Sequence, residues 1–312
     1  MGHQVIKLRI PALLALSLAA APSVAQTGTT APAEPARGAA TFDVMVSTDA
    51  DETEVARTGI NLDWSYLGED RYQGVRIEKA WFTPLGQQTT GFERIYARYA
   101  DKNDRWAWKG QIGTDGDTVL GSFNLADTSR YRKEFFVERD ILETPRGVTE
   151  GIYYTFGGVA LDIPLGERDT AVLVLGAQEF TGKNVRLHVR GNYIHVVKPD
   201  WGLTAQLRGR YFHSTEPGEY DYFSPRWYAE VLPVVQLRRY SNGWRYLLAA
   251  GYGAQANAGS DWRPSRYLNA QVSSPDTRPV WFRASVVYSN TPVGTGAVYD
   301  YLQGSLSLTT RF

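Results

Sequence analysis

Three histidines beyond the N-terminal segment are the residues most suited to acid–base chemistry: His188, His195 and His213. An imidazole can activate a serine beside an acidic residue, or bind a metal when two histidines share one face of a helix. None of the three has a spacing such as H-x-x-x-H, and no nucleophile motif accompanies them. The sequence therefore predicts no enzyme, and we interpret His188 as one polar member of a strand face.

Two acidic stretches, "DADETE" at 49–54 and "GTDGDT" at 113–118, could offer carboxylate oxygens to calcium. Neither has the full ligand spacing of a cation-binding loop, so we interpret both as solvated turns. The absence of cysteine excludes disulfides and thiolate metal sites. We predict neither a metal nor a cofactor. Basic and acidic residues both total 33, and this zero net charge argues against a nucleic-acid partner.

The main functional feature is a polar face on which arginine, glutamate and tyrosine recur at every second residue. Aromatic rings stack on sugar faces and charged groups bond to hydroxyls, so this face would suit a hydrated, uncharged or weakly charged polymer. The alternative is that the charges pair with one another and only hold a wall together. The members of this face are Arg76, Arg94, Arg98, Arg186, Arg190, Arg208, Arg210, Arg238, Glu78, Glu134, Glu138, Glu230, Tyr96 and Tyr228.

The elements that carry this face are extended strands, because apolar and polar residues alternate with a period of two. We find no ten-residue stretch with helical periodicity. The sequence predicts sixteen strands, at 42–48, 56–66, 72–83, 90–101, 104–113, 118–125, 130–139, 149–162, 168–180, 183–197, 201–213, 225–239, 243–256, 264–274, 279–290 and 299–312.

These strands fit a transmembrane antiparallel β-barrel better than a soluble sandwich or propeller. A sandwich would have to bury the polar face without partners, whereas a barrel can keep it wet. Short connections such as "DKN" and "SNG" roughly alternate with long ones such as "STEPGEYDYFSP" and "NAGSDWRP". Such asymmetry is typical of outer-membrane barrels. The prediction includes closure of the last strand on the first, so that neither is an exposed edge.

Tryptophans are placed near both expected ends of the strands, as two membrane interfaces would require. Trp64, Trp106, Trp201 and Trp244 fall near short turns, whereas Trp81 and Trp227 fall near long loops. Two residues fit this arrangement poorly. Pro233 would remove a hydrogen bond in the middle of a strand, and the parity of Lys79 points it at lipid, so a bulge or snorkelling is needed.

The N-terminal segment predicts export from the cytoplasm. Residues 1–25 have a basic start, an apolar run and a small-residue site, which is the pattern of a cleavable signal peptide; the alternative is a short membrane anchor. Residues 26–41 are small, polar and proline-bearing, as in a flexible periplasmic leader. We assign residues 42–312 to the barrel.

The stretch "GEYDYFSPRWYAEVLPVVQLRRYSNGWRYLLAAGYGAQ", residues 218–255, resembles the C-terminal barrel of bacterial exopolysaccharide exporters of the poly-N-acetylglucosamine and cellulose type. The similarity is best over about residues 150–312. It rests on a Tyr222-Phe223-Ser224-Pro225 turn at the end of an external loop, the short "SNGW" turn, and a final strand that ends in Phe312.

The resemblance implies a sixteen-stranded channel in a Gram-negative outer membrane that passes a polysaccharide to the outside. It implies lipid contact, and insertion by the barrel assembly machinery with Phe312 as part of the recognition signal. Those exporters usually carry helical repeats before the barrel, and no such period occurs here, so a separate periplasmic scaffold protein is expected. A surface receptor, an adhesion or structural partner, or a generic porin remains the alternative.

Overall fold

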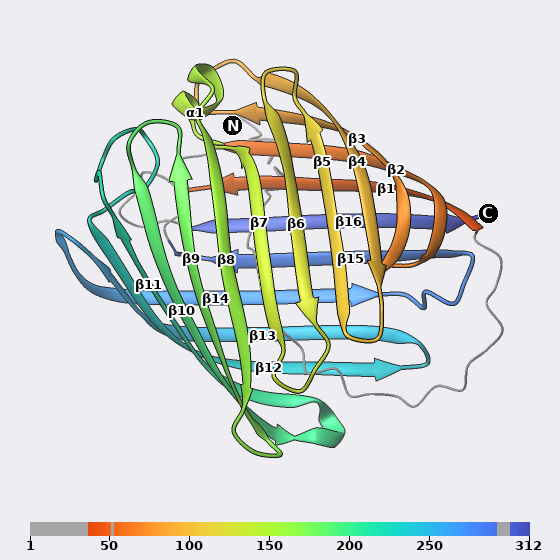
Figure 1. The fold of residues 1–312 in the computed structure, drawn as a ribbon. Helices are drawn as coiled ribbons and strands as arrows, with labels where there is room; N and C mark the ends of the chain where they lie inside the picture. Colours follow the sequence, from red (N-terminus) through yellow and green to blue (C-terminus); the bar gives the residue numbers. More distant parts are fainter. Residues whose placement is uncertain (1–36, 51–52, 292–299) are drawn as a thin grey trace, which may run out of the picture.

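The computed structural model describes residues 37–50, 53–291 and 300–312, which form one closed ring of antiparallel strands (Figure 1). Only short helices occur among these residues, α1 (Pro145–Glu150) and the 3₁₀ turn η1 (Pro199–Trp201). The sixteen strands are β1 (Arg37–Asp49), β2 (Glu54–Gly68), β3 (Arg71–Thr83), β4 (Thr90–Lys102), β5 (Trp106–Thr114), β6 (Val119–Asp127), β7 (Lys133–Ile141), β8 (Tyr153–Pro164), β9 (Asp169–Phe180), β10 (Val185–Lys198), β11 (Leu203–Ser214), β12 (Trp227–Ser241), β13 (Trp244–Asn257), β14 (Ser260–Ser273), β15 (Val280–Ser289) and β16 (Tyr301–Arg311).

The predicted closure of the last strand on the first is confirmed. β1 pairs with β16 along its length, from Ala39 opposite Arg311 to Asp49 opposite Tyr301. Beyond the last pair, the amide of Phe312 donates to the carbonyl of Gly38 at 3.0 Å. A Cβ at Gly38 would lie 2.4 Å from the Phe312 ring, so a larger residue there would require this exposed ring to shift.

The outer surface of the ring is apolar around its whole circumference, and this belt identifies the barrel as membrane-spanning. Large aliphatic side chains are exposed at alternate positions of successive strands, whereas their neighbours in sequence point inward. In the part of the chain that the structure describes, no helix is long and apolar enough to cross a membrane. Members of the belt include Ile60, Leu62, Ile77, Ile95, Ile112, Val137, Val159, Leu175, Val189, Leu207, Val235, Leu248, Leu268, Val286, Leu306 and Leu308.

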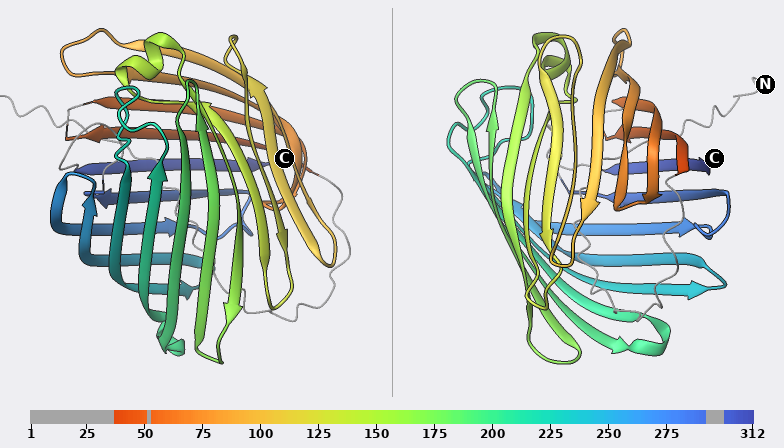
Figure 2. Two further views of the ribbon diagram at one scale, coloured as in Figure 1. Left: turned by 60° about the vertical axis from the view of Figure 1, so that its left-hand side comes forward. Right: turned by 45° about the vertical axis from the view of Figure 1, so that its right-hand side comes forward.

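The two ends of the barrel differ in the length of their connections (Figure 2). The first and last described residues lie at the same end of the barrel as the tight turns. One such turn is Asn242–Gly243, whose positive φ angles are typical of a hairpin. Most of the longer loops, α1 among them, lie at the other end. Trp64 and Trp201 are exposed near the short-turn end, as predicted for an interfacial aromatic band.

Three predicted boundaries were wrong. β1 begins at Arg37, so residues 37–41 belong to the barrel wall, where Ala39 pairs with Asp63, and not to the leader. Residues 149–152 were assigned to a strand but belong to α1 and its end, where Gly151 takes the left-handed conformation of a helix cap. The expected long loop "NAGSDWRP" is a tight turn, because β14 begins already at Ser260. The predicted signal peptide lies outside the described residues.

The two misfits in the alternation are resolved without a bulge at either site. Pro233 stays in register with Leu207 of β11, and the pairing of β12 with β13 is interrupted at Leu232 and Pro233, where the proline lacks an N–H. Lys79 does lie on the outer face, where its Nζ forms an ion pair of 2.6 Å with Glu93, its direct partner across β3 and β4.

Candidate functional site: the barrel lumen

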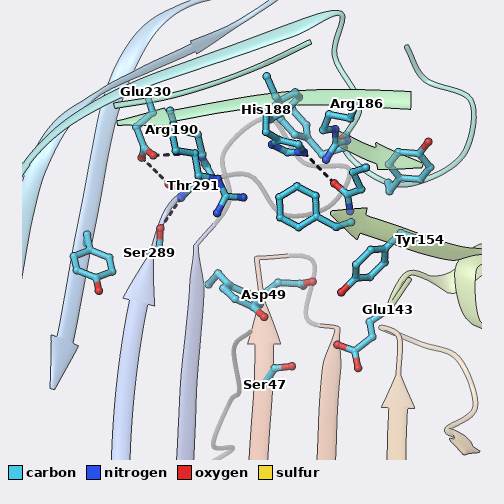
Figure 3. Close-up of a pocket in the computed structure, with 18 of the residues that line it drawn as sticks. Ser47, Asp49, Glu143, Tyr154, Arg186, His188, Arg190, Glu230, Ser289 and Thr291 are labelled. Atoms are coloured by element: carbon cyan, nitrogen blue, oxygen red, sulfur yellow. Dashed lines mark hydrogen bonds and ion pairs between the residues drawn. The ribbon is translucent and has the colours of Figure 1, made fainter. Parts of the chain in front are cut away.

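The barrel encloses a cavity of about 930 Å³ that is bordered by side chains from β1, β2 and from β7 to β16. Figure 3 shows Arg186, His188 and Arg190 along one side of this cavity, with Asp49 and Glu143 on the opposite side. The two sides differ in how their charges are satisfied.

The side chains of the polar face lie inside the barrel. Seven of the fourteen are packed inside the barrel without bordering the cavity, namely Arg76, Glu78, Arg94, Tyr96, Arg98, Glu134 and Tyr228. Seven border the cavity: Arg186, Arg190, Arg208, Arg210, Arg238, Glu138 and Glu230.

The wall formed by β1–β4 and β7 carries a paired network of charges. Arg76 bonds to Asp43 at 2.6 and 2.8 Å and to Glu78 at 2.8 Å. Arg94, of whose side chain only 1% is exposed, lies 3.0 Å from Glu78 and 3.2 Å from Asp140. These groups satisfy one another, so on this side the charges hold the wall together.

Arg57 extends this network to the long-loop end of the barrel. Its guanidinium donates to Glu143 and lies 3.5 Å from Asp140. Arg57, Asp140 and Glu143 were missing from the sequence-based set. Asp140 shares the parity of Glu134 and Glu138, and this signal could have found it.

The wall formed by β9–β12 is different, because its arginines contact aromatic rings more than carboxylates. The guanidinium carbon of Arg186 lies 4.4 Å from the ring centre of Phe212 and 5.0 Å from that of Phe180, and its Nη2 donates to the carbonyl of Phe223 at 2.6 Å. Arg190 lies over the ring of Phe156 at 5.6 Å. Cation–π contacts hold these side chains in place but leave their charge uncompensated.

Three glutamates of the polar face compensate these arginines only in part. Glu230 lies 3.5 Å from Arg210. Glu138 accepts a hydrogen bond from Tyr154 at 3.3 Å, and no described cation lies within ion-pair distance of it. Glu134 pairs with Arg132 at 2.7 Å, because β7 places it toward the short-turn end and away from the arginines.

The Tyr222-Phe223-Ser224-Pro225 motif ends the 215–226 loop, which folds inward at the long-loop end. Tyr222 is buried, stacks on Phe180 at 4.4 Å, and accepts a hydrogen bond from Asn184 at 2.8 Å. Burial raises the pKa of the Tyr222 phenol. Tyr222 and Phe223 both border the cavity, so the motif forms part of its wall.

A second contact ties this loop to α1 across the mouth of the barrel. Asp221 accepts hydrogen bonds from the Thr144 hydroxyl and from the Arg146 amide, each at 2.7 Å. Thr144 in turn caps α1, because its hydroxyl accepts from the amide of Gly147 at 3.0 Å. The loop is therefore fixed both to the wall and to the neighbouring helix.

The remaining candidate residues do not come together into a reactive site. His188 is buried inside the barrel between Phe156 and Phe212, within 3.2 Å of Gln178, whereas His195 lies 2.8 Å from Asp169 at the other end of β10. In the "GTDGDT" turn, one Asp115 oxygen accepts from two backbone amides and the other from Tyr153 at 2.9 Å. Hydrogen bonds within the protein thus account for both oxygens of Asp115.

Comparison with known proteins rests on structure alone. No family model matches the sequence, and no curated protein does. A solved structure described as a bacterial polysaccharide outer membrane secretin is similar with a TM-score of 0.67 at 12% identity, over 88% of this chain and 98% of that chain. The chain has the fold of an outer-membrane β-barrel. Pseudomonas aeruginosa OccK5 (OpdH) also aligns, with a TM-score of 0.43 at 10% identity, over 89% of this chain and 98% of that one.

Proposed function

We propose that the protein is an outer-membrane channel that exports an exopolysaccharide through its lumen. The observation that carries this proposal is the wall formed by β9–β12, where arginines alternate with aromatic rings beside a free volume. Rings offer stacking faces to sugars, and guanidinium groups donate to hydroxyl and acid oxygens. The likeness to a polysaccharide secretin supports the same function.

In this proposal, the outer face of the barrel indicates where in the cell the protein lies. The aliphatic belt would contact lipid in a Gram-negative outer membrane. The exposed ring of Phe312, at the closing edge of the wall, would be read by the barrel assembly machinery. A separate periplasmic scaffold protein would deliver the glycan to the short-turn end.

Deletion of the encoding gene tests the proposed function. We expect secreted and surface glycan to be lost, with glycan retained in the periplasm, because the polymer has no other path across the outer membrane. Staining and compositional analysis of the two fractions would measure this, with the wild-type chain supplied in trans as the control. Unchanged secretion together with reduced uptake of small solutes would instead indicate a generic porin.

A further inference from the structure

The arginines that border the cavity on β10, β11 and β12 carry more positive charge than the described residues compensate. Arg186, Arg190 and Arg208 have no carboxylate within ion-pair distance in the described ranges, and Arg208 bonds only to Gln206, at 3.0 and 3.1 Å. Arg238 likewise makes no ion pair there. Of these arginines, Arg210 has an ion pair among the described residues, at 3.5 Å from Glu230.

Two of these arginines directly oppose each other. Arg190 of β10 is the register partner of Arg210 of β11, and both point into the lumen. Like charges directly opposite on neighbouring strands are destabilising. Glu230 does not relieve this alone, because its Oε1 also accepts from the hydroxyls of Ser265 and Thr291, the latter at 2.8 Å. An anion between the two guanidinium groups would remove the repulsion.

The opposite side of the cavity cannot supply that anion, since its carboxylates are already engaged. Asp140 and Glu143 pair with Arg57, and Asp221 caps α1 together with Thr144. Glu138 and Asp221 are cavity carboxylates that accept from hydroxyl or amide groups and have no described cation within ion-pair distance. Two such carboxylates compare with four arginines that have no described ion pair, so the unpaired positive charge exceeds theirs and lies on one wall.

The arginines also extend along the full length of the strands. The amide of Arg238 donates to the carbonyl of Gly202 at the short-turn end of β11, and Arg186 is level with Ser214 at the other end. At ~3.3 Å per residue, the distance from Gly202 to Ser214 is about 40 Å along the strand. Arg208, and then Arg190 with Arg210, lie between these two levels. An anionic polymer would thus meet arginine at successive heights.

We infer that this wall binds an acidic glycan, whose carboxylate, sulfate or phosphate groups bond to Arg186, Arg190, Arg208 and Arg238 while its rings lie against Phe156 and Phe212. The inference rests on the proposed function and names its substrate class. It replaces the expectation of an uncharged or weakly charged polymer, which followed from a polar face whose charges looked evenly mixed in sequence. In space, the paired charges and the unpaired arginines occupy different walls.

Block of single-channel current in planar bilayers tests the inference, with trigalacturonate as an acidic probe and maltotriose as an uncharged one. We expect trigalacturonate to interrupt the current and maltotriose to have little effect. Arg186→Gln with Arg190→Gln should raise the half-blocking concentration of trigalacturonate about tenfold or more, because each charged hydrogen bond contributes to affinity. Lysine at both positions should restore much of the block. Adding sulfate as a competitor shows whether other oxyanions share the site.

The matched control removes two arginines that form exposed ion pairs at the short-turn rim, Arg71→Gln with Arg283→Gln, and should leave the block unchanged. Heat-modifiable mobility on gels confirms that each variant is folded. Equal block by both probes, or no block by trigalacturonate in a conducting channel, would overturn the acidic substrate class and leave export itself standing. The opposite outcome is that trigalacturonate blocks the channel selectively while deletion of the gene leaves glycan secretion intact. That result would support the anion site and contradict the export function.

Discussion

Replacing Arg94 by alanine is expected to lower the free energy of unfolding by about 3 kcal/mol, which is typical of breaking a buried ion pair. Arg94 lies within 3.2 Å of both Glu78 and Asp140, and its side chain is 1% exposed. Its removal would leave each carboxylate with one cation fewer, because only Arg76 then pairs with Glu78 and only Arg57 with Asp140 among the described residues. Denaturant unfolding in detergent micelles, followed by tryptophan fluorescence, would measure the change.

The control for this prediction is Arg71→Ala. Arg71 forms an ion pair of 3.0 Å with Asp101, but both side chains are at least one-third exposed. Exposed pairs contribute about 0–1 kcal/mol, so this variant should unfold close to wild type. If Arg94→Ala were no less stable than Arg71→Ala, the paired network would not be what holds that wall together.

Releasing the 215–226 loop is expected to enlarge the path through the external mouth. Tyr222→Ala removes the stacking on Phe180 and the hydrogen bond from Asn184, together about 1.5–2.5 kcal/mol. A loss of this size raises the population of a displaced loop about tenfold or more. Single-channel recordings should therefore show larger and noisier conductance than wild type.

Tyr220→Ala is the matched control, because Tyr220 lies in the same loop but does not border the cavity. Its ring stands over Arg146 outside the lumen, with 5.0 Å between the guanidinium carbon and the ring centre. The control should keep wild-type conductance. Equal conductance of wild type and Tyr222→Ala would mean that the loop does not narrow the path.

The fold could be predicted because, in every strand, apolar side chains that face lipid alternate with side chains that face the lumen. The alternation of Leu187 and Val189 with Arg186 and Arg190 fixes which face each side chain takes, whatever its partners. The same rule placed Lys79 on the outside correctly, although the ion pair with Glu93 that accommodates it depends on the register between two strands.

The pairing of luminal charges could not be predicted, since it depends on which strands face one another across the ring. Arg57 meets Glu143, which is 86 residues away in sequence. Periodicity says nothing about such contacts. Helix α1 was not predicted, because its six residues are too few to show a helical period. Thr144 and Pro145 are nevertheless typical of a helix start.

The central claim is that one wall of a hydrated lumen carries uncompensated arginines, and ion selectivity tests it most directly. Arg186, Arg190, Arg208 and Arg210 would be replaced together by glutamine, and the reversal potential measured in planar bilayers across a salt gradient. Removing four luminal cations should shift selectivity toward cations while assembly stays nearly intact, because lumen substitutions tune selectivity more than stability. An assembled, conducting variant with the selectivity of wild type would contradict the account.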